Sequence, residues 1–198
     1  MNTTEWTCPG ADEHGFVTFP YLKQQAADSS EEAFLDRFPR PALQVVDDVP
    51  SIGSEASVQA DSGVQLLTES IQGAAILRYL TRVTFIAKRP GNPFAHLISV
   101  GRSPKNDITI AVNSVSKVHG YFVPDGDRWS FTDHGSSNGS TLNGEVLASG
   151  QHYPLKDGDR LTLGLEVTLE LLSPESLYRR VREAAQRSTR RGEPFRRG

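Results

Sequence analysis

Three polar, glycine-rich stretches in the second half of the chain combine residue types that bind anions. They are GRSPKNDI at 101–108, SVSKVHG at 114–120 and DHGSSNGST at 133–141, and a fourth stretch, LNG at 142–144, follows directly. A planar arginine guanidinium can bond two phosphate oxygens at once, while hydroxyls and loop N–H groups satisfy the remaining lone pairs. These residue types predict a phosphate-binding site, if the fold brings the stretches together.

From about residue 81 onward, the sequence has the pattern of an all-β domain that would hold these stretches in its loops. Short apolar or alternating runs, among them VTFIAK, HLISV, DITIAV and RLTLGLEVTLELL, are separated by Gly, Asn, Asp and Pro. Turn signals at intervals of about 8–12 residues are typical of a sandwich or barrel. Asp125-Gly126-Asp127 and the KDGD sequence at 156–159 predict hairpin turns.

The first 80 residues carry weaker signals. Ser29, followed three residues later by Glu32, has the capping-box pattern and predicts a short helix over about 30–38. Pro39 and Pro41 would end that helix. The other expectations here are strands at 16–19 and 42–46, an acidic polar linker at 47–63 and an ambiguous stretch at 64–80.

The C-terminal part predicts one helix and an unstructured tail. The run 175–186 has helical composition, with Pro174 at a permissible first position, and the last dozen residues are rich in arginine. We therefore divide the chain into an acidic extension at 1–75, an all-β domain at 76–173, and a helix with a basic tail at 174–198.

Composition excludes several classes of protein. The chain has 198 residues, of which 37% are apolar, so one good hydrophobic core is expected. No apolar run is long enough to span a membrane, and the N-terminus lacks the basic and apolar pattern of a secretory signal. A single cysteine, Cys8, excludes a disulfide framework and a cysteine-cluster zinc site. A reduced, cytoplasmic location fits this composition.

The net charge of −3 is unevenly distributed. Residues 1–70 carry −9, residues 71–178 carry 0, and residues 179–198 carry +6. The eight arginines of the last segment predict, as one alternative, binding to nucleic-acid phosphates. We rank that alternative lower because Phe195 is the one aromatic residue among them. An arginine-rich terminus is more often a solvated tail.

The order and spacing of the polar motifs resemble the forkhead-associated (FHA) domain. The pattern GR-x-x-x-NDI, then S-x-x-H, then S-x-NG-S-x-x-NG, then L-x-DGD-x-L-x-LG covers about residues 80–172, roughly half of the chain. The resemblance implies a β-sandwich of about eleven strands, flanked here by the mixed N-terminal extension and the C-terminal helix. Loops at one end of such a sandwich bind a phosphothreonine peptide.

The same resemblance implies roles for individual residues. Arg102, Ser116 and Ser137 would contact the phosphate, Lys117 would add positive charge, and Asn138 would hydrogen-bond the peptide backbone. The implied supporting residues are His119, which would brace the loops, Gly101 and Gly139, which would permit tight turns, and Asn143, for which turn chemistry is the favoured role.

The chain also departs from the family pattern in three places. Ser137 stands where many members have Thr, and Gly120 follows His119 where another small residue is usual. The segment from Lys88 to Phe94 lengthens the first hairpin, and it either reaches the ligand face or is simply a loop.

A second alternative is a hydrolase. Gly135–Gly139 satisfies G-x-S-x-G, the nucleophile elbow, which needs a helix directly after it. Residues 140–147 instead read as strand or turn, and His152, the one later histidine, precedes Asp157 and Asp159 rather than following them. We therefore expect no catalytic residues.

The favoured prediction is a non-enzymatic phosphothreonine-binding adaptor in the cytoplasm. It needs no metal or cofactor, and its partners would be a phosphothreonine-containing protein and the Ser/Thr kinase that phosphorylates it. Thr3 and Thr4, beside Glu5, are candidate phosphorylation sites for an intramolecular ligand. A scaffold whose segment 16–46 packs on the sandwich or on another chain is a further alternative.

Overall fold

The computed structural model describes residues 6–12, 14–46, 82–90, 92, 94, 96–126 and 128–191. The predicted linker at 47–63, the ambiguous stretch at 64–80, and Thr3 and Thr4 lie outside the described residues. The described strands are β1 (Phe16–Thr18), β2 (Ala42–Val46), β3 (Arg82–Phe85), β4 (Ile98–Gly101), β5 (Ile108–Thr109), β6 (Gly120–Asp125), β7 (Arg128–Asp133), β8 (Ser140–Leu142), β9 (Glu145–Val146), β10 (Tyr153–Leu155), β11 (Arg160–Leu163) and β12 (Val167–Leu172). The described helices are α1 (Phe19–Asp28), α2 (Glu31–Arg37) and α4 (Pro174–Arg191).

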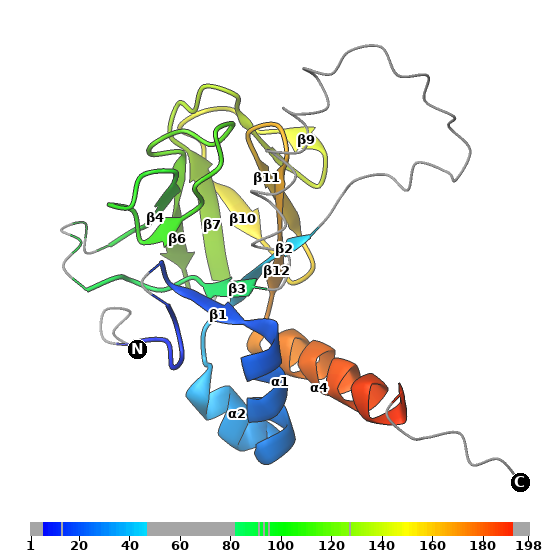
Figure 1. Ribbon diagram of the computed structural model, residues 1–198. Coiled ribbons are helices and arrows are strands. Elements are labelled where there is room, and N and C mark those ends of the chain that lie inside the picture. Colours follow the sequence, from blue (N-terminus) through cyan, green and yellow to red (C-terminus); the bar gives the residue numbers. More distant parts are fainter. Residues whose placement is uncertain are drawn as a thin grey trace, which may run out of the picture.

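The strands form two sheets that pack face to face, which confirms the predicted β-sandwich (Figure 1). One sheet has seven antiparallel strands in the order β1-β3-β2-β12-β11-β8-β9. The other has five strands in the order β10-β7-β6-β4-β5, with β4 and β5 parallel. The described strands number twelve, against the expected eleven or so. The main core lies between the sheets and includes Phe122, Phe131, Leu161, Leu163 and Leu169.

The N-terminal segment supplies two strands of the seven-stranded sheet. β2 lies between β3 and β12, with Leu43 opposite Thr84 on one side and Leu171 on the other. β1 forms the edge next to β3. Main-chain hydrogen bonds therefore cross the boundary expected between residues 75 and 76, and segment 16–46 packs on the sandwich rather than standing apart from it.

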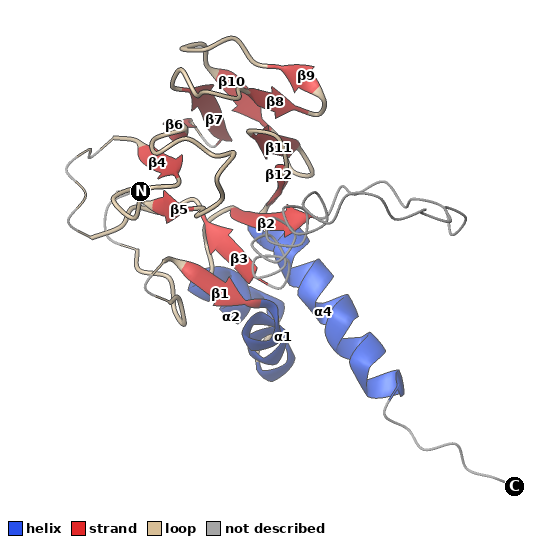
Figure 2. Cartoon of the chain, turned by 45° about the horizontal axis from the view of Figure 1, so that its top comes forward, coloured by secondary structure: helices blue, strands red, loops and turns tan. Residues whose placement is uncertain are grey.

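A second apolar cluster joins the helices to one end of this sheet. It includes Val17, Leu22, Phe34, Phe85 and Val181, all of them buried. Strand residues alternate between two faces, so Phe16 points into the sandwich core while its neighbour Val17 points toward the helices. The helices thus form a third layer beneath β1, β3 and β2 (Figure 2).

Two of the helices were predicted and one was not. The expected helix at 30–38 is α2, but its N-cap is Ser30, whose hydroxyl accepts from the Ala33 N–H, whereas Ser29 ends α1. α1 itself was missed. α4 begins at Pro174 as expected but continues to Arg191, so residues 187–191, which we assigned to an unstructured tail, are helical.

The two predicted hairpin turns have different outcomes. β6 and β7 pair directly as far as Asp125 and Arg128, so they form the hairpin predicted there. The KDGD turn at 156–159 joins β10 to β11, which lie in different sheets, so the hairpin prediction was wrong there. That turn crosses the sandwich. Asp159 still closes it, since its carboxylate accepts from the Lys156 N–H at 2.7 Å.

The helices and the polar loops lie at opposite ends of the sandwich. β12 runs from one end to the other. The turn before it packs Gly164 against the Ser114 carbonyl at the loop end, and the strand ends at Leu172 beside α4.

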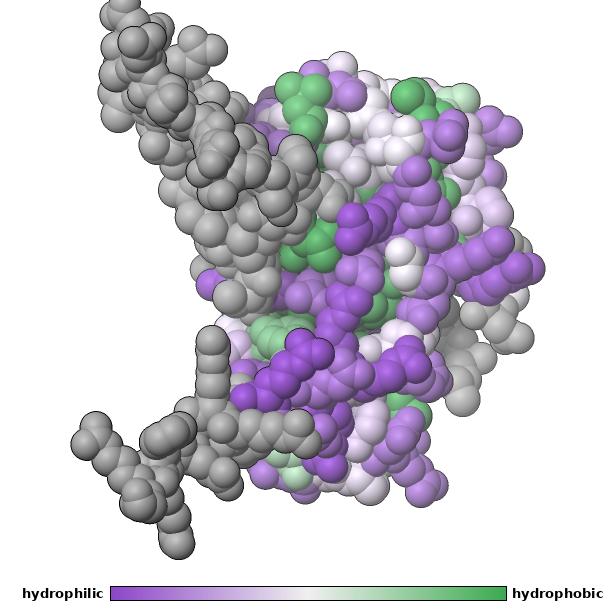
Figure 3. Space-filling model, turned by 90° about the vertical axis from the view of Figure 1, so that its right-hand side faces the viewer, coloured by the Kyte–Doolittle hydropathy of each residue, from purple (hydrophilic) through white to green (hydrophobic). Residues whose placement is uncertain are grey.

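The face on the side of β9 and α4 is mostly hydrophilic in its lower half (Figure 3). None of the described helices has the length and apolar composition needed to cross a membrane.

Candidate phosphate-binding site

Three loops converge at the end of the sandwich away from the helices. One follows β4 and carries Arg102, one precedes β6 and carries Ser116, and one follows β7 and carries Ser137. The Arg102 N–H donates to the Ser116 carbonyl at 2.8 Å, and the Ser137 N–H donates to the Ser116 hydroxyl at 3.0 Å. The structure therefore brings together the three residues expected to face a phosphate, although they are far apart in sequence.

Arg102 is oriented by the neighbouring loop before β6 and keeps donors available. Its side chain is half-buried, and its Nε donates to the Val115 carbonyl at 3.1 Å. Within the described part of the chain, its two terminal nitrogens make no hydrogen bond, and neither does the ammonium of Lys117, which is exposed. Both cations can therefore be offered to a ligand at no cost in internal bonds.

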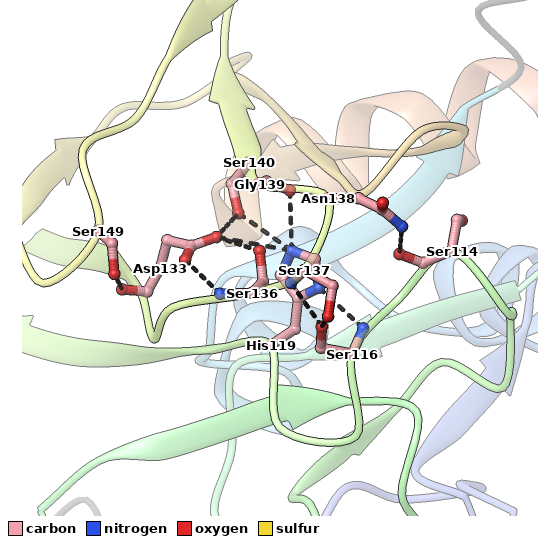
Figure 4. Close-up of polar contacts among 10 residues, drawn as sticks. All are labelled: Ser114, Ser116, His119, Asp133, Ser136, Ser137, Asn138, Gly139, Ser140 and Ser149. Atoms are coloured by element: carbon pink, nitrogen blue, oxygen red, sulfur yellow. Dashed lines mark hydrogen bonds and ion pairs between the residues drawn. The ribbon is translucent and has the colours of Figure 1, made fainter.

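Ser116 and Ser137 present a pair of hydroxyls in contact with each other. Their Oγ atoms are 3.4 Å apart, a weak contact that an anion with stronger acceptor oxygens would replace. Ser137 is exposed and Ser116 is half-buried, so the pair lies at the surface of the rim (Figure 4).

Asn138 holds the next part of the rim. Its side-chain NH₂ donates to the Ser114 carbonyl at 2.8 Å. Its side-chain oxygen makes no hydrogen bond among the described residues and remains available to accept from a backbone N–H. The Ser114 hydroxyl donates in turn to Glu166 at 3.0 Å, so the turn between β11 and β12 borders the same rim.

His119 links two of the loops from below and does not reach the surface. The Ser116 N–H donates to its Nδ1 at 3.1 Å, which fixes Nδ1 as the acceptor and places the proton on Nε2. Nε2 then donates to the Gly139 carbonyl at 3.1 Å. This is the bracing role expected for His119. Burial lowers its pKa, although Asp133 and the Gly139 carbonyl act in the opposite direction, so the ring is held neutral.

Asp133 organises the loop that carries Ser137. Its carboxylate accepts from the Ser136 N–H at 2.9 Å, from the Ser136 hydroxyl at 2.6 Å and from the Ser140 hydroxyl at 2.6 Å. Burial acts to raise the pKa of Asp133, but these hydrogen bonds outweigh it and the net shift is downward. A buried, ionised carboxylate therefore fixes both ends of the loop (Figure 4).

The glycines and Asn143 support the loops, in part by means other than expected. A Cβ atom on Gly101 would lie 2.5 Å from the Lys117 carbonyl oxygen, so Gly101 permits close approach of two loops rather than a tight turn. Gly139 has a φ of 74°, as a tight turn requires. Asn143 has a φ of 52° and holds the Arg160 N–H and Asp159, which is the turn role we favoured.

Sequence reasoning missed the buried residues that hold these loops. Asn106 donates to the carbonyls of Ser103 and Lys117 at 2.8 and 2.7 Å, tying the first loop to the second. Asp133 does the same within the third loop. Both residues lie inside the polar stretches. Their positions in NDI and DHGSS were the one feature of the sequence that could have indicated a structural role. The part of the chain that the structure describes has no cluster of three or more His, Cys, Asp or Glu suited to a metal.

Residues 98–164 match the family model of the FHA domain. The matched segment runs from the start of β4 to the turn after β11, and so contains every residue of the site except Glu166. The chain therefore contains an FHA domain, which confirms the resemblance seen in the sequence. The helices, β1, β2, β3 and β12 lie outside the matched segment.

Three known proteins are similar to parts of the chain. Protein FraH of Nostoc sp. is 40% identical over 63 residues, which make up 31% of this chain and 22% of FraH. The FHA domain of an Arabidopsis thaliana hypothetical protein, solved in solution, is 23% identical, with 68% of this chain and 85% of that chain covered and a TM-score of 0.45. Mycobacterium tuberculosis EmbR, solved with a low-affinity phosphopeptide, is 28% identical, with 40% of this chain and 20% of that chain covered and a TM-score of 0.36.

Proposed function

We propose that this protein is a non-enzymatic adaptor that binds a phosphothreonine-containing segment of another protein. FHA domains bind phosphothreonine peptides. The observation that carries the proposal is the shared rim of Arg102, Ser116 and Ser137, with Lys117 and Asn138 beside them. A phosphate group brings about −1.5 to −2 charge near pH 7 and three strong acceptor oxygens, which these donors match.

The expected affinity follows from the number of donors. Each hydrogen bond to a charged group contributes about 1.5–3 kcal/mol net, and ordering of the peptide offsets part of the sum. A dissociation constant in the micromolar range, about −8 kcal/mol, is the expected result. The partners would be a phosphorylated protein and an upstream Ser/Thr kinase in the cytoplasm, with threonine preferred over serine through contact with its methyl group.

Calorimetry with phosphothreonine peptides and the full chain tests the proposal. We expect binding that requires the phosphate and that free phosphothreonine competes away. Arg102→Ala should weaken it by about 2–5 kcal/mol, because the phosphate loses its principal cation. Ser137→Ala should weaken it less, since the Ser137 N–H still bonds Ser116 without the hydroxyl.

Arg128→Ala is the matched control. Arg128 is an exposed arginine at the start of β7, at the opposite end of the strand from the site. It should bind as the wild type does. The assignment of the site would be refuted if Arg102→Ala bound the phosphothreonine peptide as tightly as the wild type does. It would also be refuted if the two arginine variants lost the same amount of affinity.

The structure weighs against the hydrolase alternative. Ser140–Leu142 forms β8, where a nucleophile elbow needs a helix. Within the described part of the chain, the Ser137 hydroxyl contacts Ser116 and no histidine or carboxylate. His152 instead bonds Thr132 at 2.7 Å. A serine-reactive probe should leave Ser137 unlabelled.

The arginines of α4 also count against nucleic-acid binding. Arg180 makes two hydrogen bonds to Glu170, at 2.6 and 2.9 Å, and Arg182 donates to the Ala26 carbonyl. Arg179 donates to Ser176. These cations bind the protein's own groups, so the basic segment serves in part to attach α4.

A further inference from the structure

The loop that carries Arg102 joins two parallel strands within very few residues. β4 ends at Gly101 and β5 begins at Ile108, and the two strands lie side by side with Val100 opposite Ile108. Parallel neighbours are ordinarily joined by about a dozen residues or more. Here residues 102–107 suffice, so the chain must fold back directly after the arginine. Such a short loop can hold Arg102 in one position only if its far end is fixed.

Asp107 fixes that end from inside the protein. Its carboxylate is fully buried and accepts from the Ser99 N–H at 2.8 Å and from the Ser99 hydroxyl at 3.0 Å. It also accepts from the Arg89 N–H at 2.9 Å and from the Lys88 ammonium at 3.0 Å. A charge without access to water is tolerated only when it is paired and hydrogen-bonded. The hold on the loop therefore depends on these donors.

Lys88 and Arg89 hold the loop at two different points. The Lys88 side chain is 6% exposed, and its ammonium also donates to the Leu97 carbonyl at 3.0 Å. The Arg89 side chain donates to the Pro104 carbonyl, in the middle of the loop, at 2.9 Å. Both residues belong to the lengthened connection between β3 and β4. The lysine thus provides the counter-charge for Asp107, and the arginine fixes the turn that follows Arg102.

We propose that Lys88 and Arg89 are positioning residues for the phosphate site, which hold the Arg102 guanidinium in the orientation that bonds two phosphate oxygens. This inference rests on the proposed function. The Lys88 ammonium is buried against two acceptors, so it acts on a ligand only through the loop. A guanidinium binds phosphate through a planar fork, which needs the correct angle as well as the correct position. The lengthened connection therefore supports the site from behind.

The test is calorimetry with a phosphothreonine peptide and the full chain. Lys88→Met keeps the apolar stem but removes the charge that pairs with Asp107, and it should weaken binding about five- to tenfold. In an Arg102→Lys background, the same change should weaken binding less than about twofold. A lysine is a point charge on a flexible stem, so it tolerates displacement of the loop. A variant that only lowered the folded fraction would lose the same factor in both backgrounds.

Lys156→Met is the matched control, because Lys156 is an exposed lysine in the turn between β10 and β11, at the helix end of the sandwich. It should bind the peptide as the wild type does. Three results would overturn the inference: unchanged binding in Lys88→Met, the same loss in both Arg102 backgrounds, or the same loss in Lys156→Met.

Arg89→Ala provides the test if circular dichroism shows that Lys88→Met does not fold. This change removes the bond to the Pro104 carbonyl and keeps the N–H that donates to Asp107. We expect binding to weaken about threefold in the protein with Arg102 and to stay unchanged in the Arg102→Lys background. Equal effects in the two backgrounds would refute a positioning role.

Hydrogen exchange of the free protein separates this inference from the proposed function. The N–H groups of Arg102, Ser103 and Asn106 are all hydrogen-bonded, and they should exchange about tenfold faster in Lys88→Met or Arg89→Ala, while those of β6 and β7 stay unchanged. If the variants bind phosphopeptide as the wild type does, only this inference fails. If no phosphopeptide binds the wild type, the proposed function fails, and the exchange rates alone decide whether Lys88 and Arg89 hold the loop.

Discussion

His119 supports the rim only while its ring is neutral. Its Nδ1 must accept from the Ser116 N–H, and a protonated ring has no acceptor to offer. Burial lowers the pKa of His119 below its ordinary value, so the unfolded chain takes up this proton more readily than the folded one. Stability is therefore full above the unfolded pKa of about 6.5 and falls as the pH drops below it, until the lower folded pKa is reached.

We expect the free energy of unfolding to decrease by up to about 1.4 kcal/mol per pH unit in that window. Urea titrations between pH 7 and 5 measure it. His119→Gln offers one acceptor and one donor without titrating, so its stability should vary less with pH over this range. Equal pH dependence in both proteins would contradict the assignment of the neutral ring. Asp133, whose pKa is lowered, adds a separate loss of stability at more acidic pH, as the pH falls through its folded pKa.

The structure brings Arg102, Ser116 and Ser137 together at one rim, as the sequence motifs predicted, while their contact with a ligand stays a prediction. These three residues lie in loop motifs that can be recognised from the sequence alone, without knowing how the core packs. The buried residues that hold those loops could not be predicted in the same way. Asp133 and Asn106 act through partners that only the folded chain brings near, such as Ser140 and Lys117.

At the scale of elements, the site depends on the close approach of the end of β4 to the loop before β6. Gly101→Ala would place a Cβ atom 2.5 Å from the Lys117 carbonyl and 2.9 Å from the His119 nitrogen. These are backbone atoms, so relief requires the second loop to move. We expect a loss of about 1–3 kcal/mol in the free energy of unfolding, together with weaker phosphopeptide binding.

Chemical denaturation and calorimetry on the same preparation measure both effects. Gly126→Asn is a suitable comparison, because Gly126 has open space around it and asparagine tolerates its φ of 61°. That variant lies in the turn between β6 and β7 and should bind normally. Wild-type stability and binding in Gly101→Ala would show that the loops do not need this contact.

The elements that were wrongly predicted share a physical cause. α1 has few apolar residues, and Leu22 and Ala26 are its two buried positions, so its helical period is weak; Thr18 caps it and tertiary packing on α4 stabilises it. The KDGD turn has the composition of a hairpin, but composition does not say whether the next strand pairs or crosses to the other sheet. Partner choice is a property of the whole fold.

At the scale of the molecule, the FHA segment is not independent of the rest of the chain. Removing residues 1–75 would delete β2 from between β3 and β12 and would expose Phe85 and Leu172 of the helical cluster. We expect the fragment 76–198 to aggregate or to lack cooperative unfolding. Size-exclusion chromatography and thermal circular dichroism measure this.

A chain that ends at Arg191 is the corresponding control, since it keeps every described element. It should remain monodisperse with an unchanged melting temperature. A well-folded fragment 76–198 would show instead that the N-terminal strands are dispensable. Binding experiments should accordingly use the full chain.

The bracing of the loops by His119, Asp133 and Asn106 also has a kinetic consequence. Those contacts join the protein's own groups to one another, so under the proposed function an incoming phosphate would meet donors that the fold itself positions, and only the peptide would have to become ordered. Encounter should then proceed at about 10⁵–10⁷ M⁻¹s⁻¹ or faster, and slow with rising ionic strength as Arg102 and Lys117 attract the dianion less. Under the proposed function, such a rim would respond to phosphorylation or dephosphorylation of its partner without a change in the shape of the protein.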